Sequence, residues 1–304
     1  MSVSDSFEVS VIVMTFNRAL ILRNCLESLR HQTFSRDRFE IVVVDGSKEP
    51  AREAVAAFLN SLNINHVIGT NLGIAGNRNR GAQHARGRYL AFIDDDCVAR
   101  PDWLEKLYDV VSADPLALVG GGVENVFPQN AYAVAGQAIN EAVTNFFNPP
   151  DGDPTFFPGL NFAIEREGFL KTGGCDSSFQ LLGGGEDRDF SDRWVAQGGH
   201  LVSCPDAVVR HEHRTSFRSF IRQYFSYGRG AWVYRRLKRA AGRSSVVTNP
   251  KTHRHLFSEL AGPLRRLNPV MRFKTLVLIG IWQIAYYSGI LWQAAFETLY
   301  PPRA

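Results

Sequence analysis

The first third of the chain contains two repeating patterns of apolar residues, one typical of strands and one typical of helices. Strands are predicted over residues 9–14, 40–45, 64–68 and 88–93. The first (VSVIVM) and the last (RYLAFI) are mainly apolar, which is typical of strands that are buried on both faces. Between these strands, apolar residues recur at helical spacing, first over 20–29. The pattern predicts an α/β fold: a mostly parallel, twisted sheet flanked by helices.

The pattern becomes irregular in the middle of the chain, where glycines and prolines interrupt it. We predict a strand over 116–123, a mobile loop over 126–154 and another strand near 156–164. A short helix is expected from residue 166, and a longer one from near Glu186.

Helical spacing returns in the C-terminal third, over 217–227 and 229–240. The last apolar stretch, 275–296, has no charged residue and is just long enough to span a bilayer, for which about 20 residues are needed. One broad sector of its helical wheel holds Thr275, Gln283, Gln293 and Glu297. This polar sector favours an interfacial or core-packed helix over a transmembrane span.

The composition is that of a globular protein, with 45% hydrophobic and 21% charged residues. The four cysteines form no CxxC pair. This spacing argues against a disulfide framework or a zinc site and fits a reducing compartment. The first ten residues do not resemble a secretory signal, so a cytoplasmic location is expected.

The net charge of +4 hides a strong asymmetry. Residues 1–209 carry 17 basic and 27 acidic side chains, whereas residues 210–274 carry 16 basic and 2 acidic ones. The basic block is either a solvated surface or one that meets phospholipid, a lipid-linked phosphate or nucleic acid. No nucleic-acid-binding motif is recognisable, so we expect no nucleic-acid partner.

Three consecutive carboxylates, Asp94, Asp95 and Asp96, follow the apolar run at 88–93. Acids at positions i and i+2 at the end of a strand can both reach one divalent cation, which would cancel their repulsion and bind phosphate oxygens. The alternative is an acidic turn that caps the next helix. Ligands of parallel sheets lie beyond the carboxyl ends of the strands, where Asp45 also falls.

Two glycine-rich segments flank charged side chains. In 71–87, glycines lead into a helix that carries Arg78 and Arg80, a combination that suits phosphate; the alternative is a loop whose glycines only form turns. In 183–194, three glycines precede Glu186 and Asp187 at a helix start. These acids either cap the helix or include a general base held in a cleft.

A histidine pair follows a short apolar strand in the sequence HEHR, at His211 and His213. Either imidazole is a candidate nitrogen ligand, and a structural role is the alternative. The spacing is not that of an HExxH metalloprotease helix.

The order of these parts resembles the family 2 glycosyltransferases of GT-A fold, which are inverting enzymes that use nucleotide-activated sugars. The motifs that carry the resemblance span about residues 8–230: TFNR at 15–18, VVVDGS at 42–47, the run that ends in DDD at 94–96, GGGED at 183–187 and HxH near 211. The chain departs from the family pattern in VDGS, where VDDGS is common, and in having Cys175 where Phe is usual.

The resemblance implies roles for individual residues. Asp187 is the expected catalytic base, and Glu186 the neighbour that orients the acceptor. Asp94 and Asp96 form the DxD motif that binds Mn²⁺ or Mg²⁺, with His211 as a further ligand and His213 as the second choice. The residues expected to bind the nucleotide sugar are Thr15, Phe16, Asn17, Arg18, Asp45, Gly73, Arg78, Asp94 and Asp95. Acceptor contacts are expected from Asn161, Gly185 and Glu186.

The same resemblance divides the chain into three parts. Residues 1–125 are expected to form a Rossmann-like half that binds the nucleotide sugar, and residues 126–215 an acceptor-binding and catalytic half. Residues 216–304 then form a basic, helical C-terminal region with an apolar last helix.

The expected reaction moves a sugar from a nucleotide-diphospho-sugar, with a UDP-sugar as the default donor, to a hydroxyl of a glycan or lipid-linked acceptor in cell-surface polysaccharide or glycoconjugate synthesis. A histidine ligand favours Mn²⁺. The basic C-terminal region suggests peripheral contact with the inner face of the cytoplasmic membrane. The alternatives are a metal-dependent nucleotidyltransferase and an inactive protein that binds sugar nucleotides.

Overall fold

The computed structural model describes residues 7–149, 152–179, 182–242 and 256–300. Its centre is an eight-stranded sheet with the strand order β3-β2-β1-β4-β7-β6-β8-β5. The strands are β1 Val9–Thr15, β2 Phe39–Asp45, β3 Ile64–Ile68, β4 Tyr89–Asp94, β5 Cys97–Ala99, β6 Ala117–Asn125, β7 Asn161–Glu165 and β8 His200–His211. The predicted mixed α/β fold is confirmed.

The first four strands of the chain pair in parallel, as the apolar runs predicted. Strand β7 is antiparallel to both β4 and β6, and β5 is antiparallel to β8, while β6 and β8 are parallel. In the register of β1, Met14 lies beside Asp94 and Thr15 beside Asp45. The polar residues that end these strands therefore meet at one edge of the sheet.

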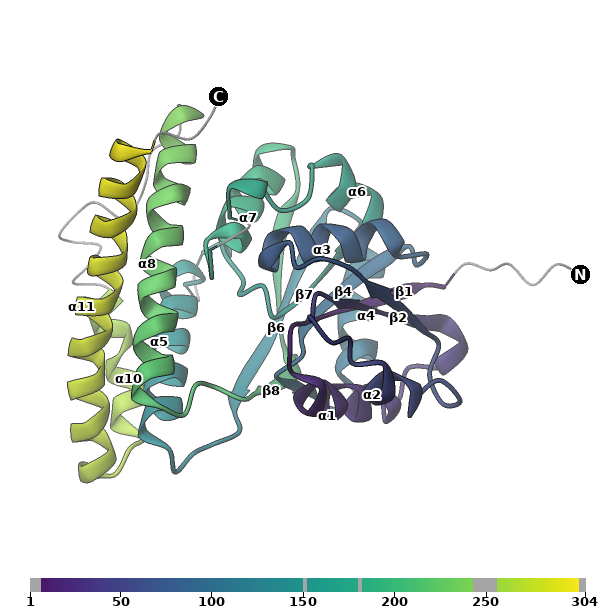
Figure 1. The fold of residues 1–304 in the computed structure, drawn as a ribbon, viewed down its shortest axis with the longest axis horizontal. Coiled ribbons are helices and arrows are strands. Elements are labelled where there is room, and N and C mark those ends of the chain that lie inside the picture. The colour runs from purple at the N-terminus through teal and green to yellow at the C-terminus, as the bar shows by residue number, and fades with distance from the viewer. Residues whose placement is uncertain (1–6, 150–151, 180–181, 243–255, 301–304) are drawn as a thin grey trace, which may run out of the picture.

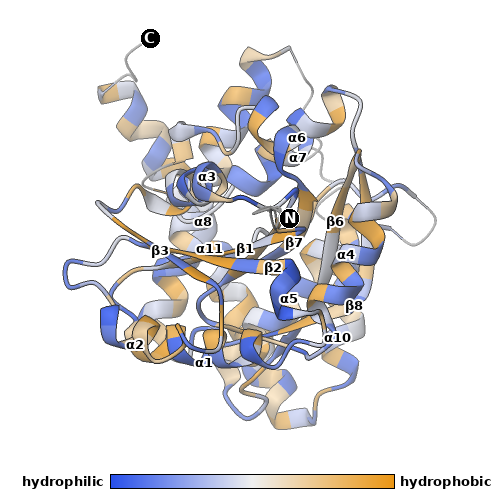
Figure 2. Cartoon of the chain, turned by 90° about the vertical axis from the view of Figure 1, so that its right-hand side faces the viewer, coloured by the Kyte–Doolittle hydropathy of each residue, from blue (hydrophilic) through white to orange (hydrophobic). Residues whose placement is uncertain are grey.

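Helices cover both faces of the sheet (Figure 1). Figure 2 shows α3 on one side of the first strands, and α1 and α2 on the other. The helices of this part are α1 Ala19–Arg30, α2 Arg52–Ala56, α3 Gly73–His84, α4 Trp103–Ala113, α6 Arg166–Lys171 and α7 Glu186–Ala196, with 3₁₀ turns at Arg36–Arg38 and Ser177–Phe179. Val11 and Val13 pack into the core under α1 and α4, and Ile12 into the core under α3. This two-sided burial explains why β1, β2 and β4 are mainly apolar.

A helical bundle stands beside the sheet (Figure 1). It consists of α5 Ala131–Phe147, α8 Phe217–Ala240, α10 Ala261–Arg265 and α11 Pro269–Leu299. Its own hydrophobic core includes Ile139, Phe220, Tyr224, Leu278 and Trp282.

Helix α5 corrects the prediction of a mobile loop over 126–154, of which residues 150–151 lie outside the described part of the chain. The side chain of Asn130 caps the helix by accepting hydrogen bonds from the backbone N–H groups of Tyr132 and Ala133. The prolines of this region precede or follow the helix and do not interrupt it. Its small residues pack on neighbouring helices, so they do not mark a loop; Ala135 and Ala142 are fully buried.

Helix α8 is continuous, whereas the sequence predicted two stretches separated at Gly228. A Cβ atom on Gly228 would overlap the carbonyl oxygen of Tyr286 in α11, and one on Gly289 of α11 would overlap the carbonyl oxygen of Phe225. The glycines thus allow the two helix backbones to touch, and they do not break either helix.

The polar sector of α11 faces the protein, and its apolar residues face outward. Gln293 accepts a hydrogen bond from Arg229 Nε of α8 at 2.9 Å, and Glu297 accepts one from Trp232 Nε1 at 2.9 Å. On the other side of α11, Ile284 and Leu291 are about 70% exposed. Among the described residues, α11 is the one helix that is long and apolar enough to cross a membrane. In its most apolar segment, 39% of the residues are buried.

Candidate active site

The three aspartates lie at the end of β4 and are neutralised by arginines. Arg18 spans two of them: Nη1 donates to Asp96 Oδ2 at 2.7 Å, and Nη2 pairs with Asp95 Oδ1 at 2.5 Å. Asp95 also accepts a hydrogen bond from Thr15 Oγ1 at 2.7 Å. Arg78 Nη2 lies 3.7 Å from Asp94 Oδ1. The arginines provide the positive charge that such a crowded acidic cluster requires.

Burial and the neighbouring cations have opposite effects on the pKa values of these carboxyl groups. Burial raises the pKa of Asp95 to about 7, although Arg18 opposes the change. Burial raises the pKa of Asp94 as well, with Arg78 opposing. The pKa of Asp96 is held below its usual range because His211, Arg18 and Arg214 together outweigh its burial.

Asp96, Cys97 and His211 bring ligand atoms within 4.8 Å of one another, which fits a metal site. Asp96 Oδ1 and His211 Nδ1 are buried without a hydrogen-bond partner among the described residues, as expected of atoms that await a cation. A carboxylate oxygen suits either Mn²⁺ or Mg²⁺, and an imidazole nitrogen favours Mn²⁺ of the two. Burial raises the pKa of the Cys97 thiol well above its usual value. Sulfur ligands suit softer metals, so Cys97 fits Mn²⁺ or Mg²⁺ less well than the carboxylate does.

The structure favours His211 over His213 as the metal ligand. His211 Nε2 lies 3.4 Å from Asp96 Oδ1. His213 Nε2 instead pairs with Gln137 Oε1 of α5 at 2.8 Å, and its ring packs on that of His211. Burial lowers the pKa of His213 to about 3, so it is neutral and supports the position of His211.

The turn after β1 is held against the loop after β2. Asn17 adopts a positive φ of 54°, its N–H donates to Ser47 Oγ at 2.7 Å, and its Oδ1 accepts from Lys48 N at 3.2 Å. Phe16 is 41% exposed at this turn. At the start of α3, Gly73 has a φ of 69°, a conformation that favours glycine.

Asp45, expected to contact the nucleotide base, is held by backbone N–H groups of this loop and by His66 of β3. Its Oδ1 accepts from Ser47 N at 2.9 Å, and its Oδ2 accepts from Ala51 N at 2.7 Å and lies 3.1 Å from His66 Nε2. Asp45 therefore shapes the loop that lies beside Thr15–Arg18.

Arg78 connects the acidic cluster to the second carboxylate motif. Its Nη1 donates to Glu186 Oε1 at 2.7 Å, and its side chain is almost fully buried. A Cβ atom at position 159 would overlap the guanidinium, so Gly159 is needed for this approach. Burial and the neighbouring Asp187 raise the pKa of Glu186 to about 7, against the effect of Arg78.

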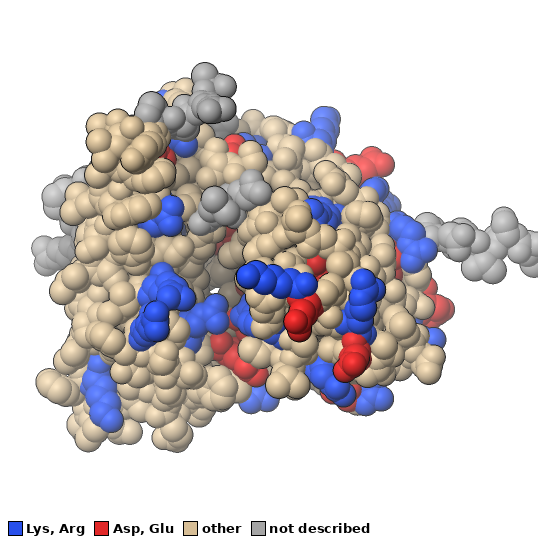
Figure 3. Space-filling model, in the orientation of Figure 1, with Lys and Arg blue, Asp and Glu red and all other residues tan. Residues whose placement is uncertain are grey.

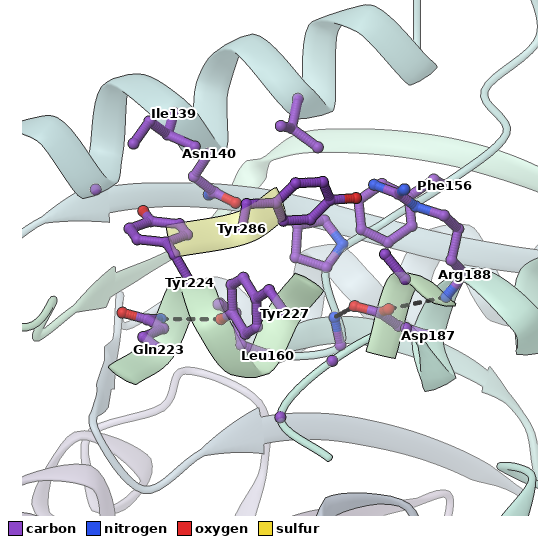
Figure 4. Close-up of a pocket in the computed structure, with 18 of the residues that line it drawn as sticks. Ile139, Asn140, Phe156, Leu160, Asp187, Arg188, Gln223, Tyr224, Tyr227 and Tyr286 are labelled. Atoms are coloured by element: carbon purple, nitrogen blue, oxygen red, sulfur yellow. Dashed lines mark hydrogen bonds between the residues drawn. The ribbon is translucent and has the colours of Figure 1, made fainter. Parts of the chain in front are cut away.

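Asp187 lies in the first turn of α7 and points into a cavity of about 230 Å³ (Figure 4). Its Oδ2 accepts a hydrogen bond from Gly159 N at 3.1 Å, and its Oδ1 accepts one from Arg188 N at 2.8 Å. Gly185, just before the helix, has a φ of 101°, which allows the close approach of α7 to α8. Asp94, Arg78, His211 and Asp187 all line this one cavity.

Asn161 corrects an expectation, because it does not line the cavity. Its Nδ2 donates to the carbonyl oxygens of Gly122 and Ala207, and its Oδ1 accepts from Trp103 Nε1 at 2.8 Å. The amide is fully used in joining β6, β7, β8 and α4. Asn161 therefore supports the sheet, and the structure gives no basis for an acceptor contact.

Aromatic and aliphatic residues form much of the remaining cavity wall, together with polar side chains such as Asn140, Gln223 and Gln283. Most of the apolar residues were missed at the sequence level. They are Ile74, Ile139, Val143, Phe146, Phe147, Phe156, Leu160, Tyr224, Tyr227, Ala231, Tyr234, Leu256, Trp282, Tyr286 and Tyr287. The alternation of aromatic and arginine residues over 217–229 was the available signal for Tyr224 and Tyr227. Ile139 and Val143 were missed because their helix was predicted as a loop.

Comparison with known proteins now identifies the family. Residues 10–182 match the family described as Glycosyl transferase family 2. The chain belongs to this family. A relative of similar length is the glycosyltransferase AglE of Haloferax volcanii, 35% identical over 93% of this chain and 95% of that protein. The glucosyl-dolichyl phosphate glucuronosyltransferase of the same organism is 30% identical over 73% of this chain and 75% of its own length.

A solved structure shares the fold. The mannosyltransferase PcManGT from Pyrobaculum calidifontis, in complex with GDP-Man and Mn²⁺, has a TM-score of 0.64 at 18% identity, covering 99% of this chain and 89% of that one. The family and the structural likeness together show that this glycosyltransferase has a GT-A-type fold, as its motifs predicted.

Proposed function

We propose that this family 2 glycosyltransferase transfers a sugar, with inversion, from a nucleotide-diphospho-sugar to a hydroxyl group of a glycan or lipid-linked acceptor, with the aid of a divalent cation. One observation carries the proposal: the candidate cation ligands Asp94 and His211 and the candidate base Asp187 line the same cavity. A donor diphosphate beside the aspartates and an acceptor hydroxyl beside Asp187 would thus meet in one space.

The residues of the chain have distinct parts in this reaction. Asp94, Asp96 and His211 would hold Mn²⁺ or Mg²⁺, which supplies positive charge to the leaving diphosphate when bound. Arg78 adds a fixed cation on the same side. Asp187 accepts the proton of the acceptor hydroxyl as that oxygen attacks the anomeric carbon from the face opposite the leaving group. Glu186, held by Arg78, positions Asp187 and the acceptor.

Two classes of donor, UDP-sugars and GDP-sugars, can be compared directly by experiment. A UDP-sugar is the default for the motif set, whereas the structural neighbour was solved with GDP-Man. The paired turns of residues 15–18 and 45–48 would hold the base and ribose of either donor. A thermal-shift screen of UDP- and GDP-sugars, with and without Mn²⁺, decides between them.

A lipid-linked acceptor and a peripheral membrane position form the finer part of the proposal. One relative from Haloferax volcanii supports it through the glucosyl-dolichyl phosphate in its name. The excess of basic side chains over 210–274 adds attraction to an anionic surface, which suggests the inner face of the cytoplasmic membrane. Figure 3 shows mainly Lys and Arg among the charged residues of the helical bundle.

The variant Asp187→Asn tests the proposed base. Because the amide cannot accept the proton, we expect turnover to fall by about 10²–10⁴-fold while binding of the nucleotide sugar persists. Radiolabelled sugar transfer gives the first quantity, and a Mn²⁺-dependent thermal shift with the donor gives the second. Transfer at a near wild-type rate would refute the role of Asp187.

The variant Asp96→Ala is the matched comparison for the cation site. It should lose the Mn²⁺-dependent thermal shift with the donor, because one carboxylate ligand is gone. A donor shift that is independent of metal in the wild-type protein would contradict the proposed cation site.

A further inference from the structure

The side chain of Gln137 lies where the helical bundle meets the sheet. Its Nε2 donates to the carbonyl oxygen of Val123 in β6 at 2.9 Å, and to Glu141 Oε1, one turn further along α5, at 3.1 Å. Its Oε1 lies 2.8 Å from His213 Nε2. Gln137 is not one of the described residues that line the cavity. Its contacts therefore serve the protein and not a substrate.

These bonds fix the direction of the hydrogen bond between Gln137 and His213. A carbonyl oxygen and an ionised carboxylate can only accept, so the atom that faces Val123 and Glu141 must be the amide nitrogen. The atom that faces His213 is then the amide oxygen, which can only accept as well. His213 Nε2 therefore carries a proton and donates it. Helix α5 thus fixes both the tautomer and the orientation of this ring.

Further contacts confine the ring of His213 between α5 and His211. The centroids of the two imidazole rings are 4.3 Å apart, with an angle of 64° between the ring planes. A Cβ atom on Gly136 of α5 would lie 3.2 Å from His213 Nδ1, so the helix backbone closely approaches the ring. The backbone N–H of His213 donates to the carbonyl oxygen of His211 at 3.1 Å. A shift of the His213 ring would therefore move the ring of His211.

His211, the candidate metal ligand, has few other contacts that could orient it. Its Nε2 lies 3.4 Å from Asp96 Oδ1, within the candidate cation site, and its Nδ1 is buried without a hydrogen-bond partner among the described residues. In most metal sites, a hydrogen bond from the second ring nitrogen orients a histidine ligand. Here the described residues provide no such bond outside the cation site. Packing against His213 takes its place.

We propose that Gln137 is a positioning residue for the cation. Its hydrogen bond holds the ring of His213, and this ring keeps His211 directed towards Asp96. The inference rests on the proposed function, because it requires a cation that His211 helps to bind. It makes the helical bundle part of the cation site, although α5 itself provides no candidate ligand.

The same segment of α5 also forms part of the cavity wall. Gly136, Ile139 and Asn140 line the cavity, and they lie within one turn of Gln137 (Figure 4). A displacement of α5 would therefore reach both the cavity and the cation site.

Binding of Mn²⁺ to the full-length, untagged protein tests the inference. The electron paramagnetic resonance signal of free Mn²⁺ gives the affinity, and nitrogen modulation in the pulsed spectrum of bound Mn²⁺ reports a histidine ligand. The titration is run with Mn²⁺ alone, and it is repeated with UDP and with GDP. We expect the wild-type protein to show nitrogen modulation and His211→Ala to lose it.

Two variants break the same hydrogen bond from opposite sides. Gln137→Met removes the acceptor, whereas His213→Phe removes the donor and keeps an aromatic ring beside His211. Each should weaken Mn²⁺ binding by about tenfold, as changes in the outer shell of a metal site do, and should reduce the nitrogen modulation. The double variant should bind no more weakly than the weaker single variant, because both changes remove one interaction. Wild-type affinity and modulation in His213→Phe, or multiplied losses in the double variant, would overturn the proposal.

Glu141→Ala is the matched control, since it removes a different hydrogen bond of Gln137 and leaves the bond to His213. It should bind Mn²⁺ as the wild type does. Equal weakening in Glu141→Ala and Gln137→Met would indicate a general effect of α5 and would overturn the assignment. Differential scanning fluorimetry without metal shows whether each variant folds. If Gln137→Met does not fold, His213→Phe decides, because it retains the other two bonds of Gln137.

The wild-type results separate this inference from the proposed function. Nitrogen modulation that Gln137→Met and His213→Phe leave unchanged would refute the inference alone. Mn²⁺ binding without nitrogen modulation would exclude His211 as a ligand, and it would overturn the inference while the carboxylate ligands remain. Absence of Mn²⁺ binding under all three conditions would contradict the cation site of the proposed function itself.

Discussion

At the scale of single residues, Arg18 supplies positive charge to two of the three aspartates. It joins Asp95 and Asp96, two carboxylates that are almost fully buried. Two buried acids without positive charge would repel each other and lose their hydration. In the absence of metal, Arg18 therefore stabilises the end of β4, and a divalent ion would take over part of this role.

The variant Arg18→Gln tests this exchange. We expect the metal-free protein to melt several degrees lower than the wild type, because the aspartates lose their partner. Mn²⁺ should then raise the melting temperature more in the variant than in the wild type. Differential scanning fluorimetry with and without Mn²⁺ measures both effects.

Arg23→Gln is the control for this experiment, since Arg23 is exposed on the same helix, α1. It should melt as the wild type under both conditions. Equal gains from Mn²⁺ in the three proteins would show that Arg18 does not stand in for the ion.

Sequence motifs predicted the candidate site residues that belong to short, contiguous patterns. Asp94, Asp96, Glu186 and Asp187 follow directly from short sequence patterns, and all but Asp96 line the cavity. Gln137 escaped the sequence analysis because its role depends on Val123 and His213, which come from other segments. The structural role of Asn161 escaped it for the same reason, since its three partners lie on other elements.

At the scale of elements, the pairing of α8 with α11 depends on backbone contact. Gly228 and Gly289 face each other's helix, and neither has room for a side chain. Gly280 lies on the exposed face of α11, and a Cβ atom there would meet nothing within 4 Å. Of the two glycines of α11, Gly289 is therefore packed against α8, whereas Gly280 faces open space.

Gly289→Ala and Gly280→Ala form a matched pair. The first should destabilise the protein by about 1–3 kcal/mol or more, because the methyl group pushes the helices apart. The second should stabilise it by up to about 1 kcal/mol, because alanine is the better helix former. Chemical denaturation followed by circular dichroism measures both. Similar effects of the two changes would mean that the helices do not pack through Gly289.

The sequence predicted secondary structure correctly where burial alone determines the pattern of apolar residues. The strands that are covered on both faces were found from their apolar runs, close to their observed bounds. Helix α5 was missed because its alanines and glycine resemble a loop until neighbouring helices are present to pack on them. Gly228 was taken as a helix break for a similar reason.

At the scale of the whole molecule, the helical bundle presents an apolar face outward. Ile284 and Leu291 on α11 are 70% and 69% exposed. Gln293 and Glu297 of α11 pair with α8 on the inside. Basic residues predominate over 210–274, of which 243–255 lie outside the described residues. Exposed apolar residues and a basic surface together favour an anionic membrane surface.

Vesicle flotation tests this surface. The wild-type protein should float with vesicles that contain anionic lipid at low salt, and less so at high salt, which screens the basic residues. The double variant Ile284→Gln and Leu291→Gln should float markedly less, since it loses two apolar contacts with the bilayer.

A second double variant, Leu59→Gln and Leu116→Gln, is the control. These leucines are 52% and 54% exposed but lie outside the bundle. Their replacement should leave flotation unchanged. Equal loss in both double variants would exclude a specific role for α11.

The sequence by itself determined the α/β character of the first half, the family and the carboxylates of the candidate site, because these depend on local periodicity and on residues a few positions apart. Only the tertiary structure decided which histidine approaches Asp96, which face α11 turns outward, and that Gln137 pairs with His213. Each of these depends on partners that are distant in the chain. Local sequence patterns are compatible with many such partners, and packing in the folded chain selects among them.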